Sequence, residues 1–467
     1  MQFTRRRFLA GAAGAAAAGG GLYELVDRLT AAPSRPRAAR RRLPEQHVLD
    51  AQKLVEDNGV EVVVPPLHHE IVTAKLRIDA RPSALREAQR ELEQALVRLE
   101  REFEPTPAGL GVTIAWGRPY FVRFVPAQAE KHIPLDLRAT RTNGKPTSAL
   151  LDAVRFPSDP AGTVLEHNEV AVLLRSDRRA NIAQAHRALL DQLDLFEKTS
   201  IRLGFAGGGF AGGQSLPKRM AMAANVPGAE LIPDTAELFL GFTSTQKANL
   251  GPTRIANLET LGYTHPGYFA GGTHMHLSHI FEDLETWYLN FDFGERLATT
   301  FRPGLDVPER TQTVRQDARD VETQTHVARD FHRHSTIGHS GSIQPTSRLD
   351  RDVVGADGTV YAKGTAIPQR ADFNTLDNPF AWSAAPLLDR LSPEPAAGVH
   401  FVVFNPTSDD FHRNRLAMDG VMPDGTTLPF APRDRGQGLN SVLRTSHRQN
   451  FLVPPRRHRS FPLAELL

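Results

Sequence analysis

The first twenty-one residues constrain how this chain folds. Residues 4–10 read TRRRFLA, and an apolar run rich in Ala and Gly follows to about residue 21. Arginines directly before such a run are typical of a twin-arginine export signal, and the run is too short to span a bilayer well. The twin-arginine machinery carries proteins that are already folded, commonly because a cofactor is inserted before export. We therefore expect an exported protein that completes its fold, and binds any cofactor, in the cytoplasm.

Cysteine is absent from the 467 residues. Disulfides, thiolate metal sites, iron–sulfur clusters and a lipoprotein anchor are therefore excluded, and stability must come from the hydrophobic core. The 18 histidines are the soft ligands that remain for a metal. The formal net charge is +2 and falls mostly on the basic leader, so nothing indicates nucleic acid or a lipid surface as a partner.

Composition and spacing divide the chain into a leader and two halves. Residues 1–45 form the signal and an Arg/Pro-rich linker, which could be cut near Ala31-Ala32 or kept as an anchor. Residues 46–225 and 226–467 are predicted as an N-terminal and a C-terminal domain. The stretch near 302–335 is polar, without a clear core face, and is predicted as an insertion or a long connection.

Hydrophobic periodicity predicts an α+β protein. The helix over 82–102 follows Pro82-Ser83, and its apolar residues recur at helical spacing. Other predicted helices cover 180–193 and 284–290, and predicted strands cover 60–64, 71–76, 110–116, 169–174, 274–280 and 398–404. Strand–helix–strand order of this kind favours an antiparallel sheet with helices packed on one face.

Four segments, taken together and in order, carry a resemblance to a known family. They are 240–250 (LGFTSTQKANL), 271–287 (GGTHMHLSHIFEDLETW), 337–345 (IGHSGSIQP) and 366–373 (AIPQRADF). A fifth piece, 401–410 with 414–416, continues the series. In this order and spacing they resemble the dye-decolorizing (DyP-type) haem peroxidases of the exported, twin-arginine type. The resemblance covers most of the chain after the leader, and each single motif is degenerate.

The resemblance implies a fold, a cofactor and a ligand. The fold would be two ferredoxin-like units, as in dimeric α/β barrels, with antiparallel sheets, helices on the outer faces, and haem b in the C-terminal unit. His339 matches the family's proximal iron ligand, and Asp409 or Asp410 would be the partner of its other nitrogen. A neutral imidazole is a good donor to haem iron, and a carboxylate on its second nitrogen strengthens it.

Two departures from the family affect the distal side of the haem. The family's aspartate, which moves a proton between the peroxide oxygens, is Ser244 here, and a serine hydroxyl is too weak a base for that task. Gln246, Asp234 or a water could substitute. The distal arginine is ambiguous, because an ungapped match puts Gln369 at its position and Arg370 one residue later. We expect Arg370 to supply the cation that polarises the O–O bond.

The implied reaction is peroxide-dependent oxidation of a bulky small-molecule reductant, slowed by the loss of the aspartate. General acid–base assistance is typically worth about 10²–10⁴ in rate. Trp287, Tyr288 and Trp382 are candidate electron-relay residues. The basic segment 456–459 is a candidate contact for the haem propionates.

Two other classes of function remain open. The chain could be a catalytically inactive relative that serves as a binding or structural protein. It could also be a histidine-based copper or zinc protein, since histidines cluster in two places: His265, His274, His276 and His279, and then His332 and His334.

Overall fold

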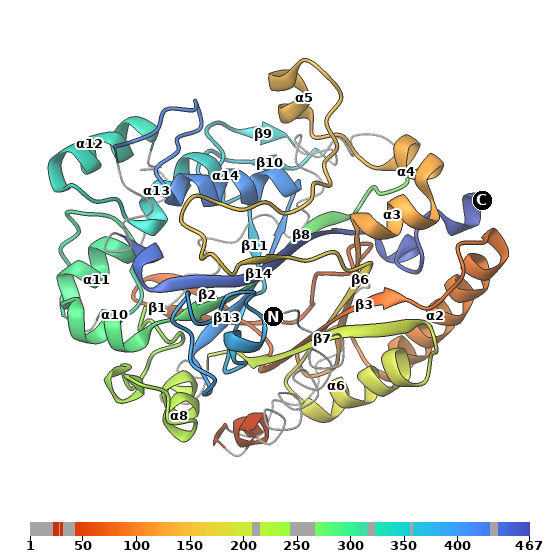
Figure 1. Cartoon of the computed structure of the whole chain (residues 1–467), viewed down its shortest axis with the longest axis horizontal. Helices are drawn as coiled ribbons and strands as arrows, with labels where there is room; N and C mark the ends of the chain where they lie inside the picture. The colour runs from red at the N-terminus through yellow and green to blue at the C-terminus, as the bar shows by residue number, and fades with distance from the viewer. Residues whose placement is uncertain are drawn as a thin grey trace.

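The computed structural model describes residues 22–27, 29–30, 43–207, 215–242, 267–309, 311–314, 323–354, 358–429 and 438–467. Two α+β units share one ten-stranded sheet, and helices cover its outside (Figure 1). No helix in these ranges is both long and apolar enough to cross a membrane.

The first unit has the order of a ferredoxin-like fold. Its strands pair antiparallel in the order β7-β3-β6-β4, with one helix after the first strand and another after the third. The elements are β3 (His68–Leu76), α2 (Pro82–Glu102), β4 (Gly111–Gly117), β6 (Val170–Ser176), α6 (Arg179–His186) with a π-helical turn (Arg187–Asp191), and β7 (Phe196–Phe205).

The second unit repeats this arrangement. Its strand order is β12-β13-β8-β14, again antiparallel. The elements are β8 (Thr273–Glu282), α10 (Leu284–Asn290), α11 (Phe293–Thr300), α12 (Gln324–His334), α13 (His339–Ser347), β11 (Gln369–Arg370), β12 (Phe373–Thr375), β13 (Gly398–Asn405), α14 (Ser408–Met418) and β14 (Leu443–Val453).

The two units close on one another. Strand β14 pairs with β4 at Phe451 and Gly117, and β12 pairs with β7 at Asn374 and Phe205. Eight strands therefore form a ring of antiparallel pairs, with no free edge in the ring. The predicted α+β fold of two ferredoxin-like units is confirmed.

Shorter elements decorate this ring. They are the hairpin β1 (Lys53–Asp57) and β2 (Val60–Val64), α3 (Arg118–Phe124), α4 (Pro126–His132), α5 (Leu137–Asn143), β5 (Val164–Leu165), α8 (Leu216–Ala223), and the hairpin β9 (Val353–Val354) and β10 (Val360–Tyr361). Strand β5 is the one parallel neighbour of β14 in the sheet.

Helix α2 shows how the sequence produces the first core. Pro82 occupies the first helical turn, where its missing N–H costs no hydrogen bond. Its apolar stripe faces the sheet: Leu85, Ala88, Leu92, Ala95, Leu96 and Leu99 are all buried. Burying each leucine contributes roughly 1.5–3 kcal/mol to stability. The predicted helix and the observed one have the same bounds.

The interior of the ring is polar at one end. His279, His400 and His447 lie together there, with ring centroids 4.5 and 5.4 Å apart, and all three are buried. His400 Nε2 lies 2.9 Å from a carboxylate oxygen of Asp377. Burial, with the nearby Arg202 guanidinium, holds the pKa of His400 well below 6.5, and burial likewise lowers the pKa of His279 and His447.

This histidine cluster predicts a loss of stability in acid. Since the unfolded imidazoles bind protons below pH 6.5 and the folded ones do not, stability falls as the pH drops below 6.5. Each such histidine would lower the free energy of unfolding by about 2 kcal/mol between pH 7 and pH 5. We expect His447→Gln to reduce the pH dependence of the free energy of unfolding, measured with urea. His334→Gln, at an exposed histidine, should leave that pH dependence unchanged. Equal slopes for His447→Gln and the wild type would contradict the assignment.

Candidate functional site

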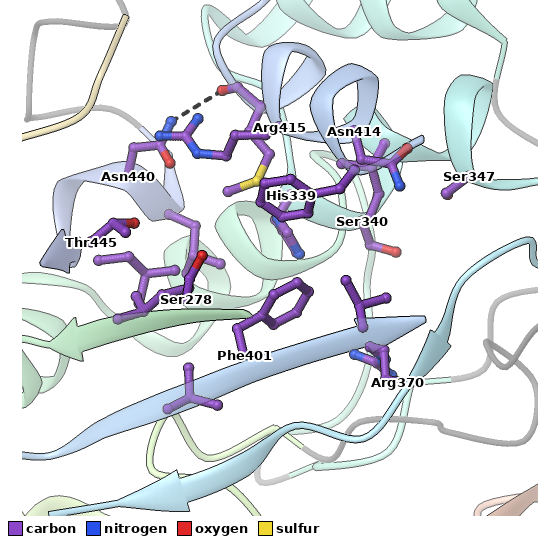
Figure 2. A pocket seen from close by; sticks show the side chains of 18 of the residues that line it. Ser278, His339, Ser340, Ser347, Arg370, Phe401, Asn414, Arg415, Asn440 and Thr445 are labelled. Carbon is purple, nitrogen blue, oxygen red and sulfur yellow. Dashed lines mark hydrogen bonds between the residues drawn. The ribbon is translucent and has the colours of Figure 1, made fainter. Parts of the chain in front are cut away.

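A cavity of about 270 Å³ lies between the outer face of the second unit's sheet and helices α13 and α14 (Figure 2). Because side chains alternate along a strand, one face of each strand lines it. These lining positions are Ser278, Ile280 and Glu282 of β8, and Val399, Phe401 and Val403 of β13. Helix α14 contributes Phe411, Asn414, Arg415 and Met418, which share one helical face.

The backbone of α13 holds His339 over this cavity. His339 is the first helical residue, after Gly338, and Gly341 donates its N–H to the carbonyl oxygen of Phe301 at 2.7 Å. A side-chain carbon at Gly338 would lie 2.2 Å from that same oxygen. Glycine is therefore required for the close approach of α13 to the end of α11. In Figure 2 the His339 ring points across the cavity toward Phe401.

His339 is a neutral imidazole at pH 7. Burial and, to a smaller extent, the positive charges of Arg370 and Arg415 together lower its pKa to about 4. Its buried Nδ1 has no hydrogen-bond partner among the described residues. A neutral ring is the form that can donate an electron pair to a metal.

The structure selects Arg370 over Gln369 as the cation at the site. In the pairing of β11 with β13, Arg370 lies opposite Val403 and Gln369 opposite Phe404. Val403 lines the cavity, whereas Phe404 packs into the core of the ring. Arg370 accordingly lines the cavity together with His339, as expected from the sequence.

The structure does not bring Asp409 and Asp410 to His339. Both stand in the first turn of α14 and bind Arg138, at 3.3 and 2.8 Å. Asp410 also accepts the backbone N–H of Thr407 at 3.0 Å, which caps the helix. Capping and charge pairing at a helix N-terminus explain their positions. The expected contact of either carboxylate with the second nitrogen of His339 is not formed.

The other expected site residues lie in varied places. Ser244 and Gln246 fall outside the described residues. Asp234 is exposed and binds Lys218 at 2.7 Å. The segment 456–459 is absent from the cavity lining, and its Arg459 binds Glu93 of α2 at 2.8 Å.

The three aromatic relay candidates are packed side chains. Trp287 is buried and its Nε1–H donates to the carbonyl of Leu240 at 2.9 Å. The hydroxyl of Tyr288 donates to the carbonyl of Phe239 at 2.7 Å. Trp382 lies against His447, with ring centroids 5.1 Å apart.

Within the described residues, the histidines predicted to cluster do not come together as a metal site of three or more ligands. The described residues contain no group of three His, Asp or Glu side chains placed to hold a metal ion, and His265 lies outside them. His274 Nδ1 lies 2.8 Å from the carbonyl oxygen of Pro406, and the His276 ring stacks on Phe411. His279 faces the interior of the ring, on the opposite side of β8 from both. His332 and His334 are exposed on α12.

Several charged side chains at the cavity escaped sequence analysis. Arg415 binds Asp419 at 2.8 Å and Arg448 binds Asp159 at 2.6 Å, all four largely buried. The lining also contains Arg348 and the carboxyl of Glu282. Period-2 alternation from Ser278 through Ile280 would have placed Glu282 on the same face of β8. The pair of Arg448 with Asp159 joins distant segments and leaves no local signal, whereas Arg415 and Asp419 are only four residues apart.

Comparisons with known proteins agree with this architecture. Residues 66–455 match "Family of unknown function (DUF7405)". A search of curated proteins found no match. A DyP-type peroxidase from Cellulomonas bogoriensis is 18% identical, with 89% of this chain and 96% of that chain covered and a TM-score of 0.52. An oxyferrous/water mixed complex of DtpA from Streptomyces lividans is 17% identical, with the same coverage and a TM-score of 0.51. These likenesses show a shared fold.

The charge of Arg370 provides a test of the site's geometry. We expect Arg370→Leu to raise the pKa of His339 above about 4, since one of the cations that lower it is removed. The pKa should stay below 6.5, because burial is the larger cause. Titration of the His339 ring by NMR measures the shift, with the exposed Lys363→Leu as control. An unchanged pKa in Arg370→Leu would show that the two side chains do not share the cavity.

Proposed function

This chain belongs to DUF7405, a family of unknown function, and we propose that it binds haem b and uses hydrogen peroxide to oxidise a bulky small-molecule reductant. The observation that carries this proposal is the pairing of a neutral imidazole, His339, with the cation Arg370 in one cavity. Solved proteins with this fold include DyP-type peroxidases. Export by the twin-arginine machinery to the outer side of the membrane belongs to the same proposal.

The residues of the cavity fit a haem. Its walls are largely apolar, including Leu238, Phe242, Phe301 and Ile343, as a flat hydrophobic macrocycle requires. Arg348 faces the same space and would complement a carboxylate of the haem. His339 offers a ligand nitrogen in the uncharged form. The lack of an acceptor at its Nδ1 makes it a weaker donor than a carboxylate-bound histidine.

Haem, when bound, would supply the redox chemistry that reduces peroxide. The protein's part is positioning and electrostatics. His339, on α13, would bind the iron from the helical side of the cavity. Arg370, on β11, lies on the sheet side. The fixed positive charge of Arg370 would stabilise negative charge that develops on the peroxide oxygens, without reorganisation of solvent. The apolar walls would exclude water and strengthen that interaction.

The absence of an aspartate at position 244 supports slow turnover. Neither serine nor glutamine accepts a proton from peroxide at neutral pH. A rate lower by about 10²–10⁴ than that of an enzyme with the base is expected if no other group replaces it.

Haem binding can be measured directly. The protein expressed with a haem supply should show a Soret band, and His339→Ala should abolish it because the ligand is removed. His334→Ala, at an exposed histidine of α12, is the matched control and should keep the band. A band that survives in His339→Ala would move the ligand elsewhere. A wild type with no band would refute haem binding, and a band without peroxide turnover would identify an inactive relative.

A further inference from the structure

One carboxyl oxygen in the cavity has no hydrogen-bond partner among the described residues. Glu282 ends β8, is 8% exposed, and its buried Oε2 has no hydrogen-bond partner among the described residues. The other described carboxylate of the lining, Asp159, is bound by Arg448 at 2.6 Å and by the N–H of Phe156 at 2.7 Å. Glu282 is therefore the lining carboxyl that remains available to a ligand.

Glu282 lies beside the segment that leads to position 244. Leu240 and Phe242 line the same cavity. Tyr288, whose pKa the charge of Glu282 helps to raise, would have its hydroxyl 2.9 Å from a side-chain carbon at Gly241. The carboxyl thus stands close to the chain from which the family's aspartate would project.

The surroundings of Glu282 suit proton transfer. Burial and, to a smaller extent, the negative charge of Asp372 together raise its pKa to about 8. Asp372, between β11 and β12, is the titratable group that acts on Glu282, and Glu282 in turn raises the pKa of Tyr288 on α10. An acid–base group is most effective when its pKa lies near the working pH.

We propose that Glu282 is the acid–base residue of this cavity, in the role that Ser244 cannot fill. This inference rests on the proposed function. Glu282 Oε2, as carboxylate, takes a proton from one oxygen of hydrogen peroxide and returns it to the other as the O–O bond breaks, so that this oxygen leaves as water. Over the full reaction peroxide takes up two protons from solvent and two electrons from the reductant, and two waters form. Glu282 itself is unchanged at the end.

The titration of Glu282 is tested without haem. Because the folded pKa of about 8 exceeds the model-peptide value of 4.5, the folded state holds a proton that the unfolded state releases, and stability falls as the pH rises from about 4.5 through 8. Glu282→Gln should remove this fall in urea unfolding of the apoprotein. Glu285→Gln, at an exposed residue of α10, is the control and should keep it. The same pH dependence in Glu282→Gln and the wild type would overturn the proposal.

The catalytic role is tested with the haem-loaded protein. Peroxide turnover should rise with pH and level off above about 8, since the carboxylate is the active form. Glu282→Gln should lower turnover by about 10²–10⁴-fold and lose that pH dependence while keeping the Soret band. Unchanged turnover in Glu282→Gln would overturn the role of Glu282 alone. A wild type without a Soret band would instead refute the proposed function.

A second observation concerns the segment directly after the export signal. Residues 22–27 are helical and packed into the fold: Tyr23 is 3% exposed and Val26 fully buried. The Tyr23 hydroxyl donates to Asp377 at 3.0 Å and accepts the N–H of Leu376 at 2.9 Å. Asp377 is the carboxylate that also binds His400.

Further contacts extend along this segment. Asp27 lies 2.6 Å from His68 Nε2, and Arg219 of α8 donates to the carbonyl of Leu29 at 2.9 Å. Tyr23 and Val26 belong to one hydrophobic cluster with Phe205 of β7. A cut near Ala31-Ala32 would detach side chains that form part of this core. We infer that the described residues 22–27 and 29–30 are retained in the mature, folded protein as part of its core, and that any cleavage falls before residue 22.

Intact mass of the exported protein tests this inference. The mass should include Tyr23, and Tyr23→Phe should lower the Tm because Asp377 and the Leu376 N–H lose a partner. Glu24→Gln, at the exposed neighbour, is the control and should leave the Tm unchanged. A mature protein that begins near residue 32, with the Tm of the full chain, would overturn the inference.

Discussion

The two pairings that join the units, β14 with β4 and β12 with β7, are the constraint on which the rest of the structure depends. Each ferredoxin-like sheet alone would expose two strand edges, which are sites for misassembly. Closing the ring removes those edges and leaves only two surfaces to cover, the interior and the outer face. Helices cover the outer face, and a cavity can form wherever a helix does not pack directly against the sheet.

The closed sheet is a single layer that separates two chemical environments, the interior of the ring and the cavity on its outer face. The interior side of β8 and β13 carries His279 and His400, while the outer side carries Glu282 and Phe401. The interior histidines are neutral because burial makes their charged forms costly. The outer cavity combines an apolar wall with His339 and Arg370. Redox chemistry in that cavity would thus be kept apart from the polar interior.

Much of the fold could be predicted from the sequence, because α2, β4, β6, β8 and β13 show clear periodicity or apolar runs. Strand β14 is not among the predicted strands, because its polar residues 444–450 are buried in the ring or the cavity and have the pattern of a loop. Strand β7 is not predicted for a similar reason, with polar residues at 197–200 and Arg202 inside the ring. Helices α3, α4 and α5, between residues 117 and 158, are not among the predicted helices.

The polar stretch near 302–335, predicted as an insertion or a long connection, is helical in part. It contains α12, whose Val327 packs with Ile337 and Met422 in a small core. At the site, His339 and Arg370, which come from two separate motifs, line one cavity. The motifs did not place Asp409 and Asp410, because their partner Arg138 comes from a segment about 270 residues earlier. Glu282 was missed because a lone glutamate at the end of a strand usually faces water.

Strand β8 takes part in both environments, and this limits how the protein can change over evolutionary time. Substitutions at alternate positions can retune the cavity or the interior independently. Inserting or deleting one residue is different, because every later side chain would then turn to the opposite face. Glu282 would turn into the ring and the imidazole of His279 into the cavity. Diversification of this site should therefore proceed by exchange of side chains within a strand of fixed length.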